Sequence, residues 1–154
     1  MEYRIEVYNR PSGSGKPGGG ILKDIADLGI KGIEAVDSVT VYRLFGDPNE
    51  AQLKRIAEEL LADPIVQDFA LGSASIPGFK PDWIIEAGFK DGVTDAVGET
   101  TVKGIRDLGI DSVQSARIAR KFLLQGVADR QTMELICRRL FANPVIENYS
   151  IIRS

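Results

Sequence analysis

The sequence predicts an α+β fold made of two tandem βαβ(β)αβ units, each with helices on one face of a small, mainly antiparallel sheet, packed as a pseudo-dimer. Three observations lead to this prediction: an internal repeat, strand-like stretches that open and close each copy, and two amphipathic helical patterns between them. We divide the chain into copy one at 1–72, a linker at 73–82 and copy two at 83–154.

The internal repeat needs no gap. IADLGI matches IRDLGI, and LADPIVQDF matches FANPVIENY, with the second member of each pair 80 residues after the first. The same spacing places Gly46 over Gly126. Between the copies, the Gly/Pro/Ser-rich stretch is typical of a linker that joins compact units.

Each copy opens with a short strand, at 3–8 or 83–87, because apolar and β-forming residues dominate both stretches. A glycine-containing connection leads to a helix with apolar residues at every third position. Gly29 and Gly109 are predicted to end these first helices, since glycine readily takes the left-handed conformation found just after a helix. The next stretches, 35–45 and its equivalent in copy two, alternate as one bent strand or a hairpin would.

The second helix of copy one is predicted to start in the sequence DPNE. Asp47 would cap the helix, Pro48 would occupy its first position, and Glu50 would complete a capping box. Asp129 is the expected cap in copy two, where the apolar stripe puts Cys137 on the core face.

The last strand of each copy follows a proline. Pro64 and Pro144 prevent the second helices from continuing, and 65–71 and 145–152 are predicted to be the closing strands. Small sheets of this kind leave edges that invite pairing with a neighbour.

Composition excludes several classes of protein. The chain is 44% hydrophobic and 27% charged, which is a globular balance. A net charge of −3 argues against nucleic-acid binding, because such proteins need a basic surface. No apolar run suits a signal peptide or a membrane span, so we expect a soluble, cytoplasmic protein.

The chain contains no histidine and one cysteine. Ser-His-Asp and Cys-His catalysis, disulfide frameworks and His- or Cys-rich zinc sites are therefore excluded. We expect no catalytic residue, cofactor site or metal site in this chain. The cysteine is interpreted as a small buried hydrophobe, since no histidine could activate it.

Residues 11–20, PSGSGKPGGG, include a Gly-Lys pair that resembles part of a phosphate-binding loop. The full pattern needs a Ser or Thr after the lysine, whereas Lys16 is followed by Pro17. The stretch is therefore interpreted as a connection into the first helix, with Gly18 the counterpart of Gly98 and Lys16 facing solvent.

Two stretches of copy two resemble a known family. LFANPVIENYSI resembles the closing segment of PurS, the small subunit of phosphoribosylformylglycinamidine (FGAM) synthase. IIEAGFKDGVTDAVGETTVKGIRDLGI is similar to the family's first strand, loop and helix, with matching residues at Lys90, Gly92, Val93, Asp95 and Gly98. Copy one is more divergent. Tandem units of this kind also resemble the N-terminal region of large single-chain FGAM synthases.

The resemblance implies a scaffold without chemistry of its own. FGAM synthase converts formylglycinamide ribonucleotide, ATP and glutamine to FGAM in purine biosynthesis, using a glutaminase and an ATP-dependent synthetase. The resemblance implies that this chain bridges those two subunits for ammonia transfer, that ATP, Mg²⁺ and glutamine are used by its partners, and that it binds neither nucleic acid nor membrane. Homo-oligomers are also possible.

A loop and a basic stretch are the candidate docking regions. Copy one (1–72) carries a net charge of −4 and the remainder of the chain (73–154) +1, so the copies differ in electrostatic character. Asp95 is expected to cap the first helix of copy two, and Gly92 to permit a tight turn before it. The candidate partner-docking residues are Lys90, Asp91, Gly92, Val93, Asp95, Arg138 and Arg139.

Two alternatives stay open. Each of these charges could belong to an ordinary solvated face, with Arg117, Arg120 and Lys121 extending the basic stretch. The fold plan also suits a tandem ACT-like regulatory module that binds an amino acid or another small ligand, and similarity of fold does not separate the two functions.

Overall fold

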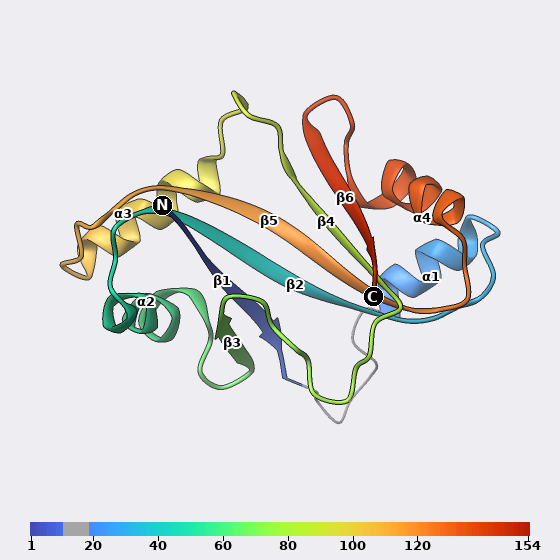
Figure 1. The fold of residues 1–154 in the computed structure, drawn as a ribbon, viewed down its shortest axis with the longest axis horizontal. Helices are drawn as coiled ribbons and strands as arrows, with labels where there is room; N and C mark the ends of the chain where they lie inside the picture. The colour runs from blue at the N-terminus through green and yellow to red at the C-terminus, as the bar shows by residue number, and fades with distance from the viewer. Residues whose placement is uncertain (11–18) are drawn as a thin grey trace. The chain divides into compact units, whose positions relative to one another are not determined.

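A computed structural model describes residues 1–10 and 19–154 of the chain (Figure 1). The expectations for Lys16, Pro17 and Gly18 lie outside the described residues. The elements in chain order are β1 (Glu2–Asn9), α1 (Gly19–Asp27), β2 (Ile33–Gly46), α2 (Glu50–Ile56), the π-helical segment η1 (Ala57–Leu61), β3 (Gln67–Leu71), β4 (Trp83–Phe89), α3 (Ala96–Asp107), β5 (Val113–Gly126), α4 (Arg130–Ile136), the π-helical segment η2 (Cys137–Phe141) and β6 (Glu147–Arg153).

The strands form a six-stranded sheet in the order β3-β1-β2-β5-β4-β6. β1 pairs antiparallel with β3, with Ile5 opposite Leu71, and β4 pairs antiparallel with β6, with Ile85 opposite Ile151. The predicted α+β class with a mainly antiparallel sheet is confirmed. The strands of the two copies join in this sheet through β2 and β5, whereas the sequence suggested separate small sheets.

β2 and β5 are uninterrupted strands of 14 residues each, which decides between the bent strand and the hairpin left open by the sequence. Gly46 and Gly126 end them, both with φ at +147°. A β-carbon at Gly46 would lie 2.2 Å from the carbonyl oxygen of Ser112, and one at Gly126 would lie 2.1 Å from that of Gly32. Both strands therefore end where only glycine fits beside a neighbouring backbone.

The chain divides into two compact units that do not follow the repeat copies. The first compact unit consists of 1–10, 40–75 and 94–119, and the second of 11–39, 76–93 and 120–154. The first thus contains α3 of copy two, and the second contains α1 of copy one. Each compact unit is built from both copies, which contribute their first helices to different units.

Each compact unit has its own apolar core. In the first, Ile5 of β1 and Ile56 of α2 belong to one buried cluster with Ile105 of α3. In the second, Ile85 of β4 and Met133 of α4 cluster with the cysteine and with α1. Figure 1 shows α2 near α3 and α1 near α4. Burial of each helix stripe against strands is the main source of stability in such a layer.

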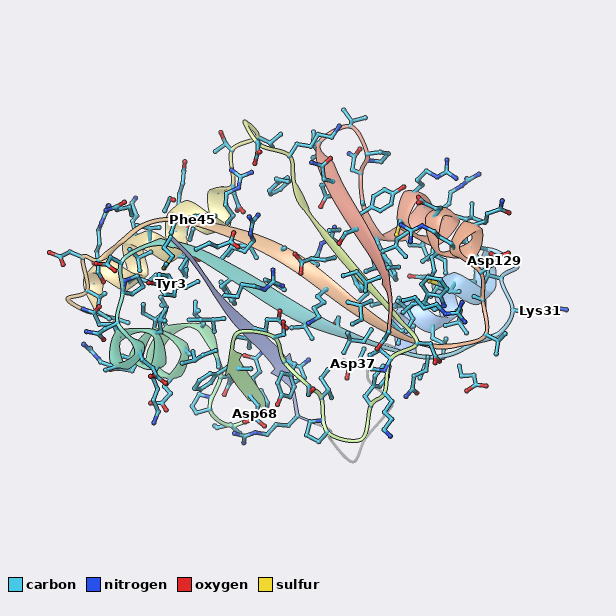
Figure 2. All side chains as sticks on the ribbon, in the orientation of Figure 1. Tyr3, Lys31, Asp37, Phe45, Asp68 and Asp129 are labelled. Carbon is cyan, nitrogen blue, oxygen red and sulfur yellow. The ribbon has the colours of Figure 1, made fainter. Side chains whose placement is uncertain are left out.

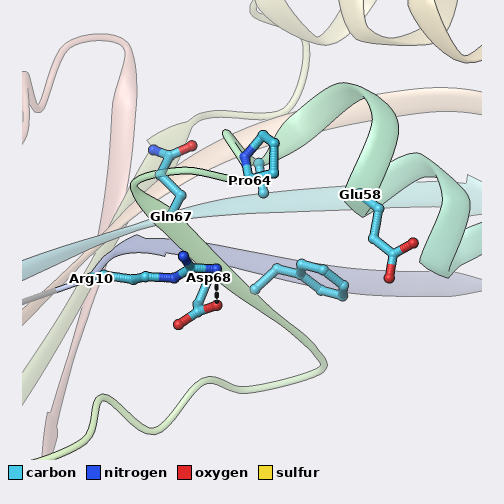
Figure 3. Close-up of a pocket in the computed structure, with 7 residues that line it drawn as sticks. Arg10, Glu58, Pro64, Gln67 and Asp68 are labelled. Carbon is cyan, nitrogen blue, oxygen red and sulfur yellow. Dashed lines mark hydrogen bonds and ion pairs between the residues drawn. The ribbon is translucent and has the colours of Figure 1, made fainter.

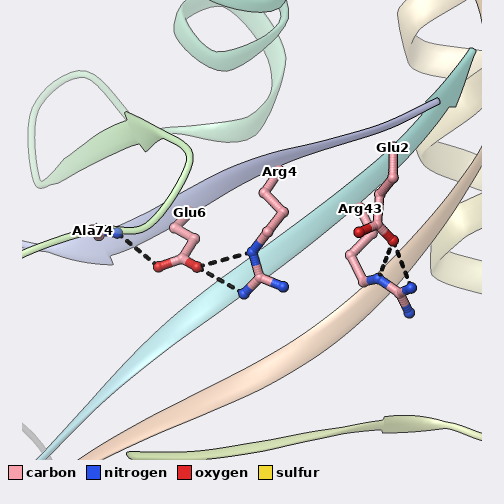
Figure 4. Close-up of polar contacts among 5 residues, drawn as sticks. All are labelled: Glu2, Arg4, Glu6, Arg43 and Ala74. Carbon is pink, nitrogen blue, oxygen red and sulfur yellow. Dashed lines mark hydrogen bonds and ion pairs between the residues drawn. The ribbon is translucent and has the colours of Figure 1, made fainter. Parts of the chain in front are cut away.

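The side of β1 that faces away from the apolar core of its compact unit is polar. Glu6, between the core residues Ile5 and Val7, has no exposed surface and accepts hydrogen bonds from Arg4 at 2.8 Å and from the backbone N–H of Ala74 at 2.8 Å (Figure 4). A buried carboxylate needs such partners, because losing its hydration is costly. This side chain therefore anchors the start of the linker to β1.

The helix starts differ from the prediction in one copy. In copy one Asn49, not Asp47, is the N-cap: it accepts from the N–H of Gln52 at 2.8 Å, and the Gln52 side chain accepts from the N–H of Asn49 at 3.0 Å. The box is therefore shifted by two residues from the predicted Asp47–Glu50 pair, because Gln52 can fill the acceptor role as well as Glu. Asp129 caps α4 as predicted (Figure 2), accepting from the N–H of Thr132 at 2.8 Å.

Candidate functional site

The loop between β4 and α3 carries most of the residues that the family resemblance singled out. After Phe89 the backbone N–H of Val93 donates to the carbonyl of Lys90 at 3.1 Å, which closes a turn. Gly92 has a φ of +87° there, a conformation that favours glycine. Asp91 and Gly92 are exposed, while Lys90 and Val93 are half-buried. The predicted tight turn is confirmed, and its tip faces solvent.

Asp95 lies just after this turn and is only 4% exposed. One carboxylate oxygen accepts from the N–H of Gly98 at 2.9 Å, and the other accepts from the N–H of Ile118 on β5 at 2.8 Å. The predicted cap is confirmed, and the same carboxylate also ties α3 to the sheet. Asp95 thus positions the helix and presents little charge to the surface.

Gly98 explains the spacing of the Asp-x-x-Gly pattern. A β-carbon at this position would lie 2.1 Å from the carbonyl oxygen of Ala116, closer than any real contact. Only glycine lets the first turn of α3 approach the β5 backbone so closely. The cap and the glycine act together, because the close approach of α3 to β5 also brings the Asp95 carboxylate within hydrogen-bonding reach of β5.

The turn before β6 is closed by side-chain and backbone hydrogen bonds at Asn143 and Glu147. Asn143 accepts through its side chain from the N–H of Val145 at 3.1 Å, and its own N–H donates to the Glu147 carboxylate at 2.9 Å. The N–H of Glu147 donates to the carbonyl of Asn143 at 2.7 Å. Arg120 then holds the turn to the sheet, donating to Glu147 at 3.0 Å and to the carbonyl of Phe141 at 2.7 Å.

Copy one repeats this turn. Asp63 accepts from the N–H of Ile65 at 2.9 Å, and Gln67 accepts from the N–H of Asp63 at 2.8 Å. The N–H of Gln67 donates back to the carbonyl of Asp63 at 2.8 Å. The repeated segment A-[DN]-P-[IV]-[VI] therefore forms a side-chain-closed turn of the kind that Asp and Asn favour.

The apolar residues at the tips of these turns are exposed. Ile65 is 80% and Val66 is 51% exposed, and their equivalents Val145 and Ile146 are 79% and 37% exposed. The sequence placed all four in the closing strands, whereas β3 begins at Gln67 and β6 at Glu147. The sequence signal for these tips was the repeated proline-containing segment. Because this segment was interpreted only as the end of a helix, it did not suggest that the residues after the proline are exposed.

Each tip is tied to the end of the strand that opens its copy. The backbone N–H of Lys90 donates to the carbonyl of Ile146 at 2.8 Å, and the N–H of Arg10 donates to the carbonyl of Val66 at 2.8 Å. A hydrogen bond thus connects the predicted docking loop of copy two to a turn that was not predicted to belong to the site.

A pocket of about 370 Å³ lies beside the turn of copy one (Figure 3). Arg10 donates to Asp68 there at 3.1 Å, and the two side chains are 45% and 47% exposed. Such an exposed ion pair stabilises the fold little. The lining residues are Arg10, Glu58, Ala62, Pro64, Gln67, Asp68 and Phe69.

The predicted basic stretch is divided by the structure. Arg138 and Arg139 are exposed on η2. Arg120 is bound into the turn, and Lys121 is only 6% exposed on β5. Arg138 and Arg139 are therefore surface residues of this stretch, whereas Lys121 is part of the buried face of β5.

Cys137 lies at the start of η2 with no exposed surface. Burial, with the nearby Glu134 carboxylate, raises the pKa of its thiol to about 12. A thiol in this environment is a poor nucleophile, which agrees with its interpretation as a core residue.

Within the described ranges, 1–10 and 19–154, no helix is long and apolar enough to cross a membrane. Across those same residues, no group of three or more His, Cys, Asp or Glu side chains could hold a metal ion.

Comparison with known proteins relates copy two to one family. The family model PurS, described as phosphoribosylformylglycinamidine (FGAM) synthase, matches residues 83–154. The phosphoribosylformylglycinamidine synthase subunit PurS of Archaeoglobus fulgidus is 38% identical over 69 residues, covering 41% of this chain and 85% of the relative.

Solved PurS structures also match about half of the chain. PurS of B. subtilis matches with a TM-score of 0.42 and 23% identity, covering 47% of this chain and 95% of that protein. PurS of Methanocaldococcus jannaschii matches with a TM-score of 0.37 and 23% identity, covering 47% of this chain and 93% of that protein. Because the sequence match extends over most of the archaeal relative at 38% identity, the chain belongs to the PurS family.

Proposed function

We propose that the chain is a non-catalytic subunit of FGAM synthase in cytoplasmic purine biosynthesis, and that it holds a glutaminase and an ATP-dependent synthetase together for ammonia transfer. The observation that carries this proposal is the 38% identity to an FGAM synthase subunit over 85% of that subunit's length. ATP, Mg²⁺ and glutamine are then bound by the partner subunits.

The chemistry of ammonia supports a bridging role. Ammonia is the useful nucleophile, but most of it is protonated in neutral water, so the site that releases it must stay close to the site that consumes it. Holding two sites in register lowers the barrier by proximity. A chain without histidine, whose cysteine is buried with a raised thiol pKa, suits this role better than it suits glutamine hydrolysis.

Within this proposal, the exposed parts of the predicted docking set are the tip of the β4–α3 loop and the η2 arginines. Asp95 and Gly98 support them by fixing α3 against β5. The ACT-like alternative receives no support from the comparisons, which relate the chain to PurS.

Reconstitution tests the proposal. The chain would be combined with the purified glutaminase and synthetase subunits of the same organism, and FGAM formation would be measured with glutamine or with ammonium chloride as the nitrogen donor. We expect the glutamine-dependent rate to require the chain and the ammonium-dependent rate to be nearly unchanged when it is omitted. Glutamine-dependent synthesis at full rate without the chain would refute the bridging role.

A further inference from the structure

A second pocket, of about 340 Å³, opens between α3 and the first residues of β5, which lie side by side (Figure 1). All of its lining residues belong to the first compact unit. Its floor is made by the buried residues Gly98, Val102 and Ala116. The close approach at Gly98 and the hydrogen bonds of Asp95 fix this floor, so little of the protein must be ordered when a ligand binds. A pocket of this size suits one small molecule.

The rim of this pocket is polar and exposed. Glu99, Lys103 and Arg106 contribute to it from α3, and Gln114 and Ser115 contribute from β5. The rim therefore carries two cations, one carboxylate, one amide and one hydroxyl above an apolar floor. A few polar groups around an apolar surface are typical of a site that orients a small polar molecule.

The two cations of the rim are not neutralised within α3. Across 1–10 and 19–154, the side chains of Lys103 and Arg106 form no ion pair or hydrogen bond, although Glu99 lies one helical turn before Lys103. In α2 the same spacing does produce an ion pair, between Arg55 and Glu59 at 2.6 Å. Both positive charges on the rim therefore remain for a bound anion.

Copy one lacks most of this rim. The residues 80 positions earlier are Ala26 for Arg106, Glu34 for Gln114 and Ala35 for Ser115. Of the two cations, only Lys103 has a cationic counterpart, Lys23. Because both copies build the same order of strands and helices, the fold itself does not require the side chains that are special to copy two. These side chains are left for a role that belongs to copy two alone.

The spacing of the rim charges restricts the shape of the ligand. Lys103 and Arg106 are three residues apart on one side of the helix, and together they match the charge of a phosphate monoester, about −2, better than that of a carboxylate. The guanidinium group also binds phosphate oxygens in pairs. At 1.5 Å per residue, Glu99 lies about 6 Å from Lys103 and about 10 Å from Arg106 along the axis. Its carboxylate repels a phosphate but accepts hydrogen bonds from hydroxyl groups.

We propose that this pocket binds a small sugar phosphate of pentose size, with the phosphate on Lys103 and Arg106 and the sugar hydroxyls at Glu99 and Ser115. The N–H of Gly98 is already bonded to Asp95, so side chains rather than the start of the helix bind the anion. The inference gives the chain a ligand-binding role beyond the proposed bridging function and does not depend on it, since all of the lining residues come from this chain.

The test is a titration of the ¹⁵N-labelled full-length chain with ribose 5-phosphate, followed by the NMR signals of the backbone amides. Inorganic phosphate and ribose are titrated separately, to distinguish the two parts of the ligand. K103A and R106A each remove one rim cation, and E99A removes the carboxylate. The matched controls are K23A, at the exposed copy-one equivalent of Lys103, and R139A, at an exposed arginine of η2. Urea midpoints establish that each variant is folded.

We expect ribose 5-phosphate to shift the amide signals of Gly98, Ser115 and Ala116 and to bind at least about tenfold more tightly than inorganic phosphate, while ribose alone causes no shift at the same concentration. K103A and R106A should each weaken its binding at least about fivefold, and the two controls less than about twofold. E99A should narrow the advantage of ribose 5-phosphate over inorganic phosphate, because the acceptor for the sugar hydroxyls is lost.

Three results would each overturn the proposal and leave the bridging function standing. The first is the absence of shifts at the pocket residues. The second is binding of inorganic phosphate as tight as that of ribose 5-phosphate, which would show that the sugar is not recognised. The third is a loss in K103A and R106A no larger than in the K23A and R139A controls, which would show that any surface cation attracts the ligand equally.

Discussion

Replacing Asp95 with alanine tests the connection between α3 and the sheet. The substitution removes the helix cap at Gly98, which costs about 1 kcal/mol of unfolding free energy. It also leaves the half-buried Ile118 N–H without this acceptor, which costs about 1–2 kcal/mol. We therefore expect a loss of about 2–3 kcal/mol, a large part of the stability of a protein of this size.

The assay is urea unfolding followed by circular dichroism. With a denaturant slope of about 2 kcal/mol/M, the expected loss lowers the urea midpoint by about 1 M. Asp95→Asn is the informative comparison: its amide oxygen can still cap Gly98, but its NH₂ group cannot accept from Ile118, so the loss should be intermediate. An Asp95→Ala midpoint within about 0.3 M of wild type, or equal to that of Asp95→Asn, would refute the two-oxygen role.

Three further predictions concern packing, assembly and reactivity. Gly98→Ala should lower the free energy of unfolding in urea by about 1–3 kcal/mol, because the added β-carbon meets the Ala116 carbonyl. Gly20→Ala on α1, where nothing lies within 4 Å, should be neutral or stabilise the fold by up to about 1 kcal/mol. Equal effects at the two sites would contradict the reasoning. A protease site inserted after Gly78, in the exposed linker, allows the chain to be cut between the copies. The two fragments should elute together in native size-exclusion chromatography and separate only in denaturant, because each compact unit uses segments of both copies. Fragments that separate while folded would contradict this division into compact units. Cys137, with its thiol pKa raised to about 12, should react with iodoacetamide at pH 8 roughly a thousandfold more slowly than a free thiol until urea unfolds the chain, and rapid labelling of the native protein would show that it is accessible.

The sequence by itself determined the duplication, the order of elements and most of their local causes. The strands at the start of each copy, the stops at Gly29 and Gly109, and the caps Asp95 and Asp129 follow from residue type and spacing. These features depend on neighbours within a few residues, and such interactions leave a periodic or positional pattern. The capping box of α2 was placed two residues too early, because DPNEAQ contains more than one acceptable cap.

The tertiary structure decided which elements share a core. Ile105 packs in a cluster with Ile5 and Ile56, although it belongs to the other copy, and no local pattern distinguishes this partner from the helix's own copy. The two copies have the same apolar stripes, so either pairing would bury similar surface. Long-range packing chose the arrangement in which the first helices lie in different compact units.

The candidate site also has one part that could be predicted from the sequence and one part that depends on tertiary packing. The β4–α3 loop was visible in sequence because its Gly and Asp serve local turn and cap roles. The exposed tip at Val145 and Ile146 was not, because apolar β-branched residues after a helix also predict a buried strand, and exposure depends on what packs against them. The sequence thus determined the turn that carries the tip. Only the tertiary structure decides that this turn lies beyond the core, and that position leaves its apolar side chains in solvent.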